Sequence, residues 1–287
     1  MRRLTAILMA ALMVFALAAC GQSSAPAAAP AAVESGVEDG VLTIAMECAY
    51  APYWTQGDDS NGAVPIKDSD NEFANGYDVM MAKKICEANG WELEVIKADW
   101  DSLVPGVQSR TYDAVIAGQS MTAERSEQVD FAGPYLYASI VCLTLKDSSF
   151  ASAQGVSDLA GGSCTSQSAT IWYDTMLPQI PNANIQPAAE SAPAMLMALE
   201  TGTVDFVCTD MPTAQGAVAA YPDMTILDFS GSEDDFVADD GDINIGVSVF
   251  KGNTALLDAI NAVLDPMTAD DFNAMMADAI AVQPMDA

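Results

Sequence analysis

The feature that most constrains the fold of this chain is an alternation of short apolar runs with helical segments, which occurs twice. In the first half, runs at 41–46, 92–97 and 113–117 alternate with segments of helical spacing at 76–89 and 101–109. Strands that alternate with helices in this way indicate a parallel sheet covered by helices. The sequence therefore predicts an α/β unit in this half.

The same alternation begins again downstream and predicts a second α/β unit. Two apolar runs, 140–145 and 243–250, lie between the units and after the second one, and either could cross between them. Amphipathic segments at 254–264 and 269–282 are suited to pack back on the first unit. We therefore expect an α/β protein of two lobes, each a sheet sandwiched by helices, hinged by two crossing segments. In the second unit, strands are expected at 164–167, 184–186, 204–208 and 224–227, and helices at 168–177, 191–202 and 211–220.

The composition excludes several classes of function. The 287 residues include 10 Lys and Arg, 40 Asp and Glu and no histidine, giving a formal net charge of −30. Such a chain is repelled by nucleic acid and by anionic lipid headgroups. The lack of histidine removes imidazole metal ligands and the commonest general base. We therefore expect no nucleic-acid partner and no metal. We also expect no cofactor and a monomer.

The N-terminal segment indicates export. Arg2 and Arg3 precede an apolar run from Leu4 to Ala19, which is short for a membrane span, and Cys20 follows. Residues 1–19 are therefore predicted to be a signal peptide that resembles a bacterial lipobox, with Cys20 lipidated; an uncleaved signal anchor is the alternative. Residues 20–40, rich in Ala, Pro and Ser, are expected to be a flexible tether.

The remaining boundaries follow from the two units and their crossings. The first lobe is expected to span 41–139, the second 140–243, and residues 244–287 to return to the first. Five cysteines remain after Cys20, odd in number and widely spaced, so we interpret them as small core residues, with one disulfide as the alternative. They are Cys48, Cys86, Cys142, Cys164 and Cys208.

The segment 117–125, AGQSMTAER, is the sharpest local signal of a binding site. It follows a predicted strand, Gly118 allows close approach to the backbone, Ser120 offers a hydroxyl, and Thr122 is a good N-cap. Arg125 then falls in the first helical turn, where the helix dipole opposes a cation unless an anion such as a carboxylate is bound there. The alternative is a surface ion pair of Arg125 with Glu124, Glu127 or Asp130.

Three other segments place polar or aromatic residues after predicted strands, where α/β folds bind ligands. In the segment ECAYAPYW, Glu47 is followed by Tyr50 and Trp54, whose flat faces suit an apolar or cationic group, although loop packing is the alternative. In the second unit Gln167 and Thr170 open a helix. Asp210 follows a strand, where a helix cap is the alternative, but a carboxylate there could receive an ammonium group. Arginine in one lobe and an acid in the other match the two charged ends of an α-amino acid.

Two acidic segments, Asp68–Glu72 and Glu233–Asp242, begin like calcium loops, but Phe73 occupies the position that requires glycine in the first and the second does not fit the pattern. We interpret both as solvated loops, with calcium as the alternative.

From Val41 onward the chain resembles the type 3 bacterial extracellular solute-binding proteins, the amino-acid receptors of ABC importers. The resemblance rests on AYAPYW, NGYDVMMAKKI, the block from ADWDSLV to DFAGPYL, SDLAG and VDFVCTD, in that order. It implies a periplasmic-binding-protein-like fold. It also implies a small-molecule amino acid as ligand and an ABC permease as partner.

Carried over by position, the resemblance makes Arg125 the residue that grips the ligand α-carboxylate, with hydrogen bonds from Ser120 and the Thr170 region. Gly118 would offer its carbonyl, and Asp210 its carboxylate, to the α-ammonium. Tyr50 would lie against the ligand side chain. Glu47 could face the end of that side chain and suit a basic or polar one. Ala123, Ala169 and Gly162 depart from the usual Pro, Gly and Lys of the family, and the second departure weakens the contacts expected from the second lobe.

The sequence thus predicts a non-enzymatic receptor anchored to the cell envelope and facing outward, which captures an amino acid between its lobes and delivers it to a permease. Two alternatives remain. An enzyme on the same scaffold, a dehydratase or a peptidoglycan-processing enzyme, would need Glu47 or Asp210 as its general acid or base. A sensory or adhesive lipoprotein is the other.

Overall fold

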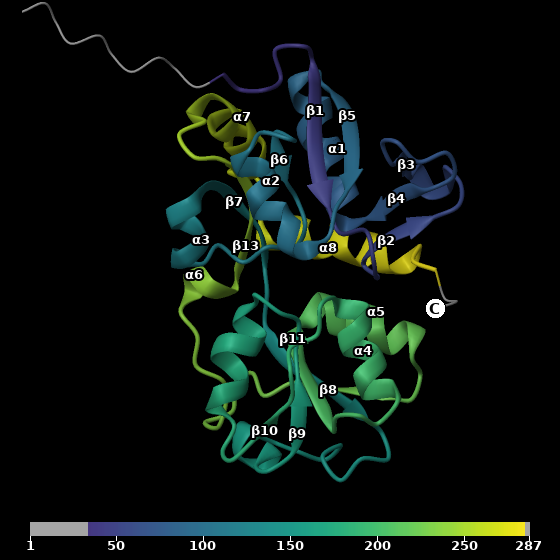
Figure 1. The fold of residues 1–287 in the computed structure, drawn as a ribbon, viewed down its shortest axis with the longest axis vertical. Coiled ribbons are helices and arrows are strands. Elements are labelled where there is room, and N and C mark those ends of the chain that lie inside the picture. The colour runs from purple at the N-terminus through teal and green to yellow at the C-terminus, as the bar shows by residue number, and fades with distance from the viewer. Residues whose placement is uncertain (1–33, 285–287) are drawn as a thin grey trace, which may run out of the picture. The chain divides into compact units, whose positions relative to one another are not determined.

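The computed structural model describes residues 34–284, which belong to one compact unit built on two five-stranded sheets (Figure 1). The predictions for the signal peptide, for Cys20 and for most of the tether lie outside the described residues. Between residues 34 and 284, no helix is long and apolar enough to cross a bilayer.

The first sheet contains four strands that run in one direction and one, β13, that runs in the opposite direction. Its order is β5-β1-β6-β13-β7, with β1 parallel to β5 and β6, and β13 antiparallel to β6 and β7. The expectation of a parallel sheet is therefore right for β5, β1 and β6, and wrong for β13, which pairs antiparallel with both of its neighbours. The strands are β1 Val41–Met46, β5 Glu92–Lys97, β6 Ala114–Val115, β7 Val129–Tyr137 and β13 Asn244–Phe250.

The second sheet repeats this arrangement. Its order is β10-β9-β11-β8-β12, in which β9 is parallel to β10 and β11, while β8 runs antiparallel to β11 and β12. The predicted strand at 204–208 is shifted by two residues, so that Asp210 is the last residue of β11. The strands are β8 Ile140–Leu145, β9 Ser163–Thr165, β10 Asn184–Ile185, β11 Phe206–Asp210 and β12 Met224–Leu227.

Helices cover the first sheet as the sequence predicted. The face of α1 that carries Val79, Ala82, Ile85 and Cys86 is buried, and Gly90 ends the helix in the left-handed conformation. The C-terminal helices α7 and α8 contact α1 and β7, and α8 also contacts α5. The helices are α1 Tyr77–Asn89, α2 Leu103–Gln108, α3 Ala123–Gln128, α7 Thr254–Leu264 and α8 Ala269–Ala281.

The helix predicted at 168–177 is wrong in its first half. Ala169 has a φ of 52°, which no right-handed helix accommodates, so the segment begins as a loop. A π-helical turn at Trp172–Met176 and a 3₁₀ turn at Leu177–Gln179 follow. The other helices are α4 Ala192–Glu200, α5 Met211–Ala220 and α6 Asp240–Ile243, and further 3₁₀ turns lie at Ser60–Gly62, Trp100–Ser102 and Val156–Leu159.

The two segments that were expected to cross between the lobes do not make the crossings. The segments 140–145 and 243–250 lie within the sheets as β8 and β13, and the links precede them at 138–139 and 228–243. The links lie side by side, because the Ala138 backbone N–H donates to the carbonyl of Ile243 at 3.1 Å. The chain therefore passes between the lobes along two neighbouring segments.

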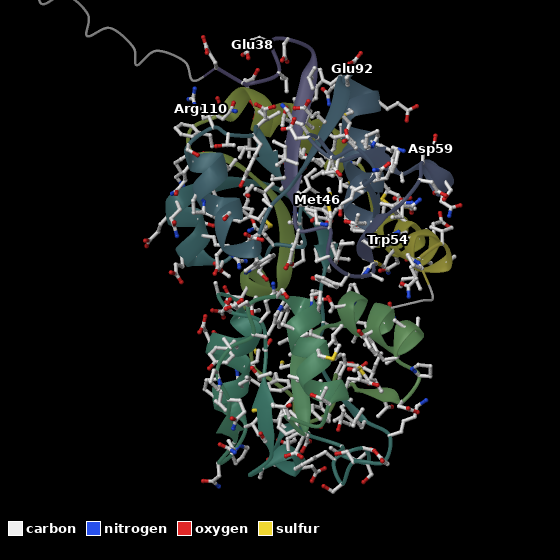
Figure 2. The ribbon with its side chains drawn as sticks, turned by 45° about the vertical axis from the view of Figure 1, so that its right-hand side comes forward. Glu38, Met46, Trp54, Asp59, Glu92 and Arg110 are labelled. Atoms are coloured by element: carbon white, nitrogen blue, oxygen red, sulfur yellow. The ribbon has the colours of Figure 1, made fainter. Side chains whose placement is uncertain are left out.

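A small sheet beside β5 was not predicted. It consists of β2 Tyr53–Gln56, β4 Phe73–Gly76 and β3 Val64–Pro65, in the order β2-β4-β3. It places Trp54 on a strand rather than in a loop, and Figure 2 shows this residue and Met46 on the side of the first lobe that faces the second.

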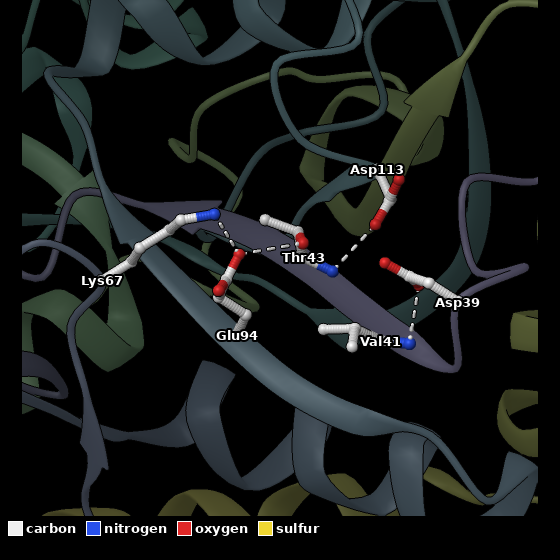
Figure 3. A network of polar contacts seen from close by, with 6 residues as sticks. All are labelled: Asp39, Val41, Thr43, Lys67, Glu94 and Asp113. Carbon is white, nitrogen blue, oxygen red and sulfur yellow. Dashed lines mark hydrogen bonds and ion pairs between the residues drawn. The ribbon is translucent and has the colours of Figure 1, made fainter.

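The opposite end of β1 is held by polar contacts (Figure 3). The Thr43 backbone N–H donates to the Asp113 carboxylate at 2.8 Å, and Lys67 pairs with Glu94 at 2.6 Å. Burial raises the pKa of Asp113 to about 6. Asp113 is thus a partly buried carboxylate at the end of β1 away from Met46.

The cysteines of the described residues are buried and free, as expected for small core residues. Cys142 and Cys208 lie directly opposite each other on β8 and β11, and both are fully buried. Burial raises the pKa of the Cys208 thiol, so Cys208 stays a neutral thiol within the core.

Candidate ligand-binding cleft

Residues of both lobes line a cavity of about 580 Å³. The first lobe contributes Trp100, Gln119 and Arg125, and the second contributes the loop that carries Ala169 and Thr170. Ligand sites in two-lobed α/β proteins lie at such boundaries between structural units. We therefore take this cavity as one part of the candidate site.

Arg125 reaches from the first lobe to the second. Its helix α3 begins at Thr122, whose side chain accepts from the Arg125 backbone N–H, as the sequence predicted. The guanidinium donates from Nη1 to the Ser120 carbonyl at 2.9 Å and from Nη2 to the Ala169 carbonyl at 2.8 Å. Burial lowers the pKa of Arg125 to about 10, so the group stays charged at neutral pH.

Arg125 forms none of the surface ion pairs that the sequence left open. Asp130 pairs with Lys251 at 2.9 Å instead, and the carbon Cζ of Arg125 lies 5.5 Å from the centre of the Trp100 ring. A guanidinium over an aromatic face keeps unused donors at its edge, where they can take a carboxylate in a bidentate arrangement.

The loop between β6 and α3 presents backbone groups rather than side chains. Gly118 has a φ of 62°, in the left-handed region, and its N–H donates to the Tyr135 hydroxyl at 3.0 Å. Ser120 is buried and forms an isolated bridge with Ile245. The neighbouring Gln119 is also buried, and its Oε1 accepts from the Ser248 hydroxyl at 3.2 Å.

Asp210 lies at the end of β11 in the second lobe. It is the N-cap of α5, since its carboxylate accepts from the Thr213 N–H at 2.7 Å, so the helix-cap alternative holds for one of its oxygens. The side chain is nevertheless buried, with the residue 9% exposed, and burial raises the pKa of Asp210. A desolvated carboxylate of this kind gains most from a cation placed beside it.

Glu47 and Gln167 meet across the lobes. The amide Nε2 of Gln167 donates to Oε2 of Glu47 at 3.4 Å. Burial, followed by the nearby charges of Asp99 and Asp101, raises the pKa of Glu47 to about 7, although the Gln167 hydrogen bond acts in the opposite direction. Among the residues that the structure describes, Glu47 has no ion-pair partner, and the carboxylates of Asp99 and Asp101 lie near it.

The remaining predicted residues divide between two places. Thr170 lines the Arg125 cavity, and its hydroxyl donates to the Gln167 carbonyl at 2.7 Å. Trp54 instead lines a second cavity of about 420 Å³, together with Tyr50, Lys97 and residues of α4 and α5. Tyr50 packs edge-on against Tyr53, with ring centres 5.7 Å apart. Of the predicted set, Arg125 and Thr170 line the first cavity and Tyr50 and Trp54 line the second. The other predicted residues line neither cavity; they are Glu47, Gly118, Ser120, Gln167 and Asp210.

Sequence reasoning missed several residues of this region. Trp100 follows β5 as Tyr50 follows β1, and this common position after a strand is the signal that could have found it. Asp78 and Tyr135 were also overlooked. Their hydroxyl–carboxylate hydrogen bond of 2.8 Å lies behind Gly118 and joins residues 57 positions apart in the sequence.

Comparisons with known proteins find amino-acid-binding proteins of similar sequence and structure. An amino acid ABC transporter substrate-binding protein of Streptococcus pneumoniae, AbpA, solved with L-arginine bound, is similar in structure, with a TM-score of 0.70 and 25% identity over 87% of this chain and 98% of that one. The ABC transporter arginine-binding protein 1 of Escherichia coli (strain K12) is 27% identical over 195 residues, 68% of this chain and 76% of that protein. The L-cystine-binding protein TcyA of Bacillus subtilis (strain 168) is 26% identical over 264 residues, 90% of this chain and 89% of the relative.

The two-lobed fold predicted from the sequence is confirmed by these similarities. The family model for bacterial extracellular solute-binding proteins, family 3, matches residues 42–278. This chain belongs to that family of bacterial extracellular solute-binding proteins.

Proposed function

We propose that this protein is the receptor of an amino-acid ABC importer and that its ligand is an amino acid with a cationic side chain. The observation that carries the proposal is the placement of opposite charges on opposite lobes. Arg125 extends from the first lobe, and the buried carboxylate of Asp210 lies in the second. An α-amino acid carries the two complementary charges on neighbouring atoms, so one ligand can engage both lobes.

The ligand carboxylate is proposed to bind Arg125. The guanidinium is held by the Ser120 and Ala169 carbonyls and retains further N–H donors. Thr170 and the backbone of its loop would add hydrogen bonds from the second lobe. Bidentate binding of a carboxylate is the geometry for which arginine is suited.

The ligand ammonium is proposed to bind Asp210 and the Gly118 carbonyl. Asp210 is desolvated, so an ammonium group that takes the place of water would restore its ordinary pKa. Breaking such a buried pair by removing one partner costs far more than a surface ion pair does. This cost would make recognition of the amino-acid backbone stringent.

The ligand side chain is proposed to lie along Tyr50 and to end near Glu47 and Gln167. Glu47 is surrounded by the charges of Asp99 and Asp101, so a guanidinium or ammonium group would be favoured there over a neutral one. Relatives whose names state arginine binding support this choice. Trp54 would contribute to the wall of the neighbouring cavity.

Delivery would follow from closure of the lobes about the two links. A ligand that contacts both lobes stabilises the closed form, which a membrane permease would recognise. We propose that a signal peptide at 1–19 and a lipid on Cys20 place this receptor, as a monomer, on the outer side of the cytoplasmic membrane, with 20–40 as tether. The lobes would be 41–139 with 244–287, and 140–243. The bound amino acid would leave chemically unchanged.

A thermal-shift screen against the twenty amino acids, ornithine and citrulline tests the proposal, followed by calorimetry and by mass spectrometry of the recovered ligand. A ligand that binds only the folded state raises its Tm. We expect the largest shift with arginine, lysine or ornithine and recovery of the ligand intact. Shifts with neutral amino acids alone would remove the assigned role of Glu47. A ligand recovered in altered form would favour an enzyme on the same scaffold, and a flat response to every compound would contradict the proposal.

A further inference from the structure

Asp78 is a buried carboxylate that the proposed ligand contacts do not use. It lies in the first turn of α1, directly after β4, and is 1% exposed. Its Oδ1 accepts from the Tyr135 hydroxyl at 2.8 Å, whereas its Oδ2 is buried without a partner among the described residues. An unpaired carboxylate oxygen inside a protein is costly, so its presence requires an explanation.

A continuous chain of hydrogen bonds joins Asp78 to the loop of the candidate site. The Tyr135 hydroxyl donates to Asp78 and accepts from the Gly118 N–H at 3.0 Å. A hydroxyl has one proton, so this arrangement requires Oδ1 of Asp78 to be an acceptor. The Tyr135 ring is fixed by stacking on Tyr77, with centres 5.9 Å apart. The orientation of the Gly118 peptide therefore depends on the state of Asp78.

The groups that face Asp78 are acids, phenols and a thiol. Burial, together with the charge of Asp210, raises the pKa of Asp78 to about 7, while the hydrogen bond from the Tyr135 hydroxyl opposes the shift. In turn, the charge of Asp78 raises the pKa values of its neighbours. These neighbours come from the β1–β2 loop, β2, α1 and β7, and they are Cys48, Tyr50, Tyr53, Tyr77 and Tyr135.

We infer that Asp78 is a positioning residue of the ammonium subsite, and that ligand binding expels a proton from it. Ionised Asp78 orients the Gly118 peptide through Tyr135 and adds its negative charge to that of Asp210. The ammonium group of any amino acid would supply the missing cation. This inference rests on the proposed function, but it concerns the backbone end of the ligand and holds for neutral and basic side chains alike.

The proton balance is simple. Before binding, Asp78 is partly protonated at neutral pH, because its pKa is about 7. The ligand enters with its ammonium already protonated, the O–H bond of the carboxylic acid breaks, and the proton leaves to the buffer. No covalent bond to the ligand forms and no oxidant is needed.

Calorimetry with glutamine in buffers of different ionisation enthalpy tests the inference, and a neutral side chain keeps Glu47 out of the measurement. We expect wild-type protein to release part of a proton at pH 7, and its affinity to fall about tenfold from pH 8 to pH 6 as the competent ionised fraction shrinks. Asp78→Asn preserves the acceptor for Tyr135 but removes the charge. It should weaken binding at least tenfold at pH 8 and abolish most of the pH dependence.

Tyr135→Phe provides a second variant, because it keeps the stacked ring and removes only the hydroxyl, and it should also weaken binding and reduce proton release. Asp113→Asn is the matched control. It also neutralises an aspartate of the first lobe, but this one is partly buried and lies at the end of β1 away from Met46. It should leave affinity and proton release unchanged.

Wild-type protein that binds amino acids without proton release, or an Asp78→Asn variant with the wild-type pH profile, would overturn the inference and leave the proposed function standing. Wild-type protein that binds no amino acid would overturn both.

Discussion

The Nη2 of Arg125 donates to the backbone carbonyl of Ala169 over 2.8 Å, so an arginine of the first lobe ends on the main chain of the second. The same guanidinium makes this contact and is proposed to bind the ligand carboxylate. Arg125→Ala should therefore lower amino-acid affinity by at least about tenfold, a loss of about 1.4 kcal/mol, measured by calorimetry. Arg125→Lys should recover little of it, because an ammonium group lacks the planar fork of donors.

Arg110 provides the control for this experiment. It is exposed, and its guanidinium lies 4.2 Å from the centre of the Phe250 ring. Arg110→Ala removes the same charge and should leave ligand affinity within about twofold of wild type, as is usual for a surface substitution away from the site. Equal losses in the two variants would show that net charge, and not the position of Arg125, governs binding.

Glu47 should make the preference for arginine depend on pH. Its pKa of about 7 means that the free carboxylate is mostly ionised at pH 8 and mostly protonated at pH 6. The ratio of arginine to glutamine affinity should therefore fall about tenfold between these pH values, because only the ionised form attracts the guanidinium. Glu47→Gln should give a low ratio that does not change with pH. A ratio in wild-type protein that is constant over this range would place the ligand side chain elsewhere.

The same residue should lower the stability of the protein without ligand at high pH. The folded pKa of Glu47 lies above its ordinary value of 4.5, so its contribution to stability is fully present below pH 4.5 and is lost as the pH rises through about 7. Glu47→Gln should consequently raise the Tm at pH 8 by roughly 2–4 °C and by less at pH 5.5. A Tm difference that is equal at both pH values would contradict the burial of this charge.

Gly216 should permit the approach of the lobes. A Cβ on this residue of α5 would lie 2.4 Å from the Ala51 carbonyl oxygen, which belongs to the first lobe. Gly216→Val should hinder closure and weaken binding at least about tenfold, with a radius of gyration that does not decrease on ligand addition. Alanine at the same position favours the helix by about 1 kcal/mol relative to glycine, so weaker binding by Gly216→Ala would not be due to loss of α5. Gly57→Ala, with nothing within 4 Å, is the control and should bind as wild type does.

Periodicity and capping residues were sufficient to predict most of the elements. The predicted helix at 211–220 has the observed bounds of α5, and Thr122 caps α3 as expected. These features depend on local physics, since the apolar spacing and the cap lie within one segment. The small sheet β2-β4-β3 was missed because its strands are two to four residues long and are interrupted by turn residues.

Contacts between distant segments explain the other errors. The loop before Trp172 has the residue pattern of a helix, but Ala169 adopts a positive φ and its carbonyl accepts from Arg125. Asp78 in a first helical turn is ordinary in sequence and indicates nothing about burial. Only its pairing with Tyr135, from a distant strand, shows that it lies behind the site. Site residues of this kind are defined by tertiary structure, so a single sequence does not reveal them.

The two links between the lobes lie side by side, joined by the hydrogen bond from Ala138 to Ile243. A single connection would allow one lobe to bend, slide and twist relative to the other. A pair of adjacent connections resists twisting and leaves one soft axis along which the lobes can swing. Opening and closing would then follow a single arc, so ligands of different size would halt the same motion at different points along it. A permease that recognises only the fully closed receptor could therefore distinguish bound molecules by size without contacting them.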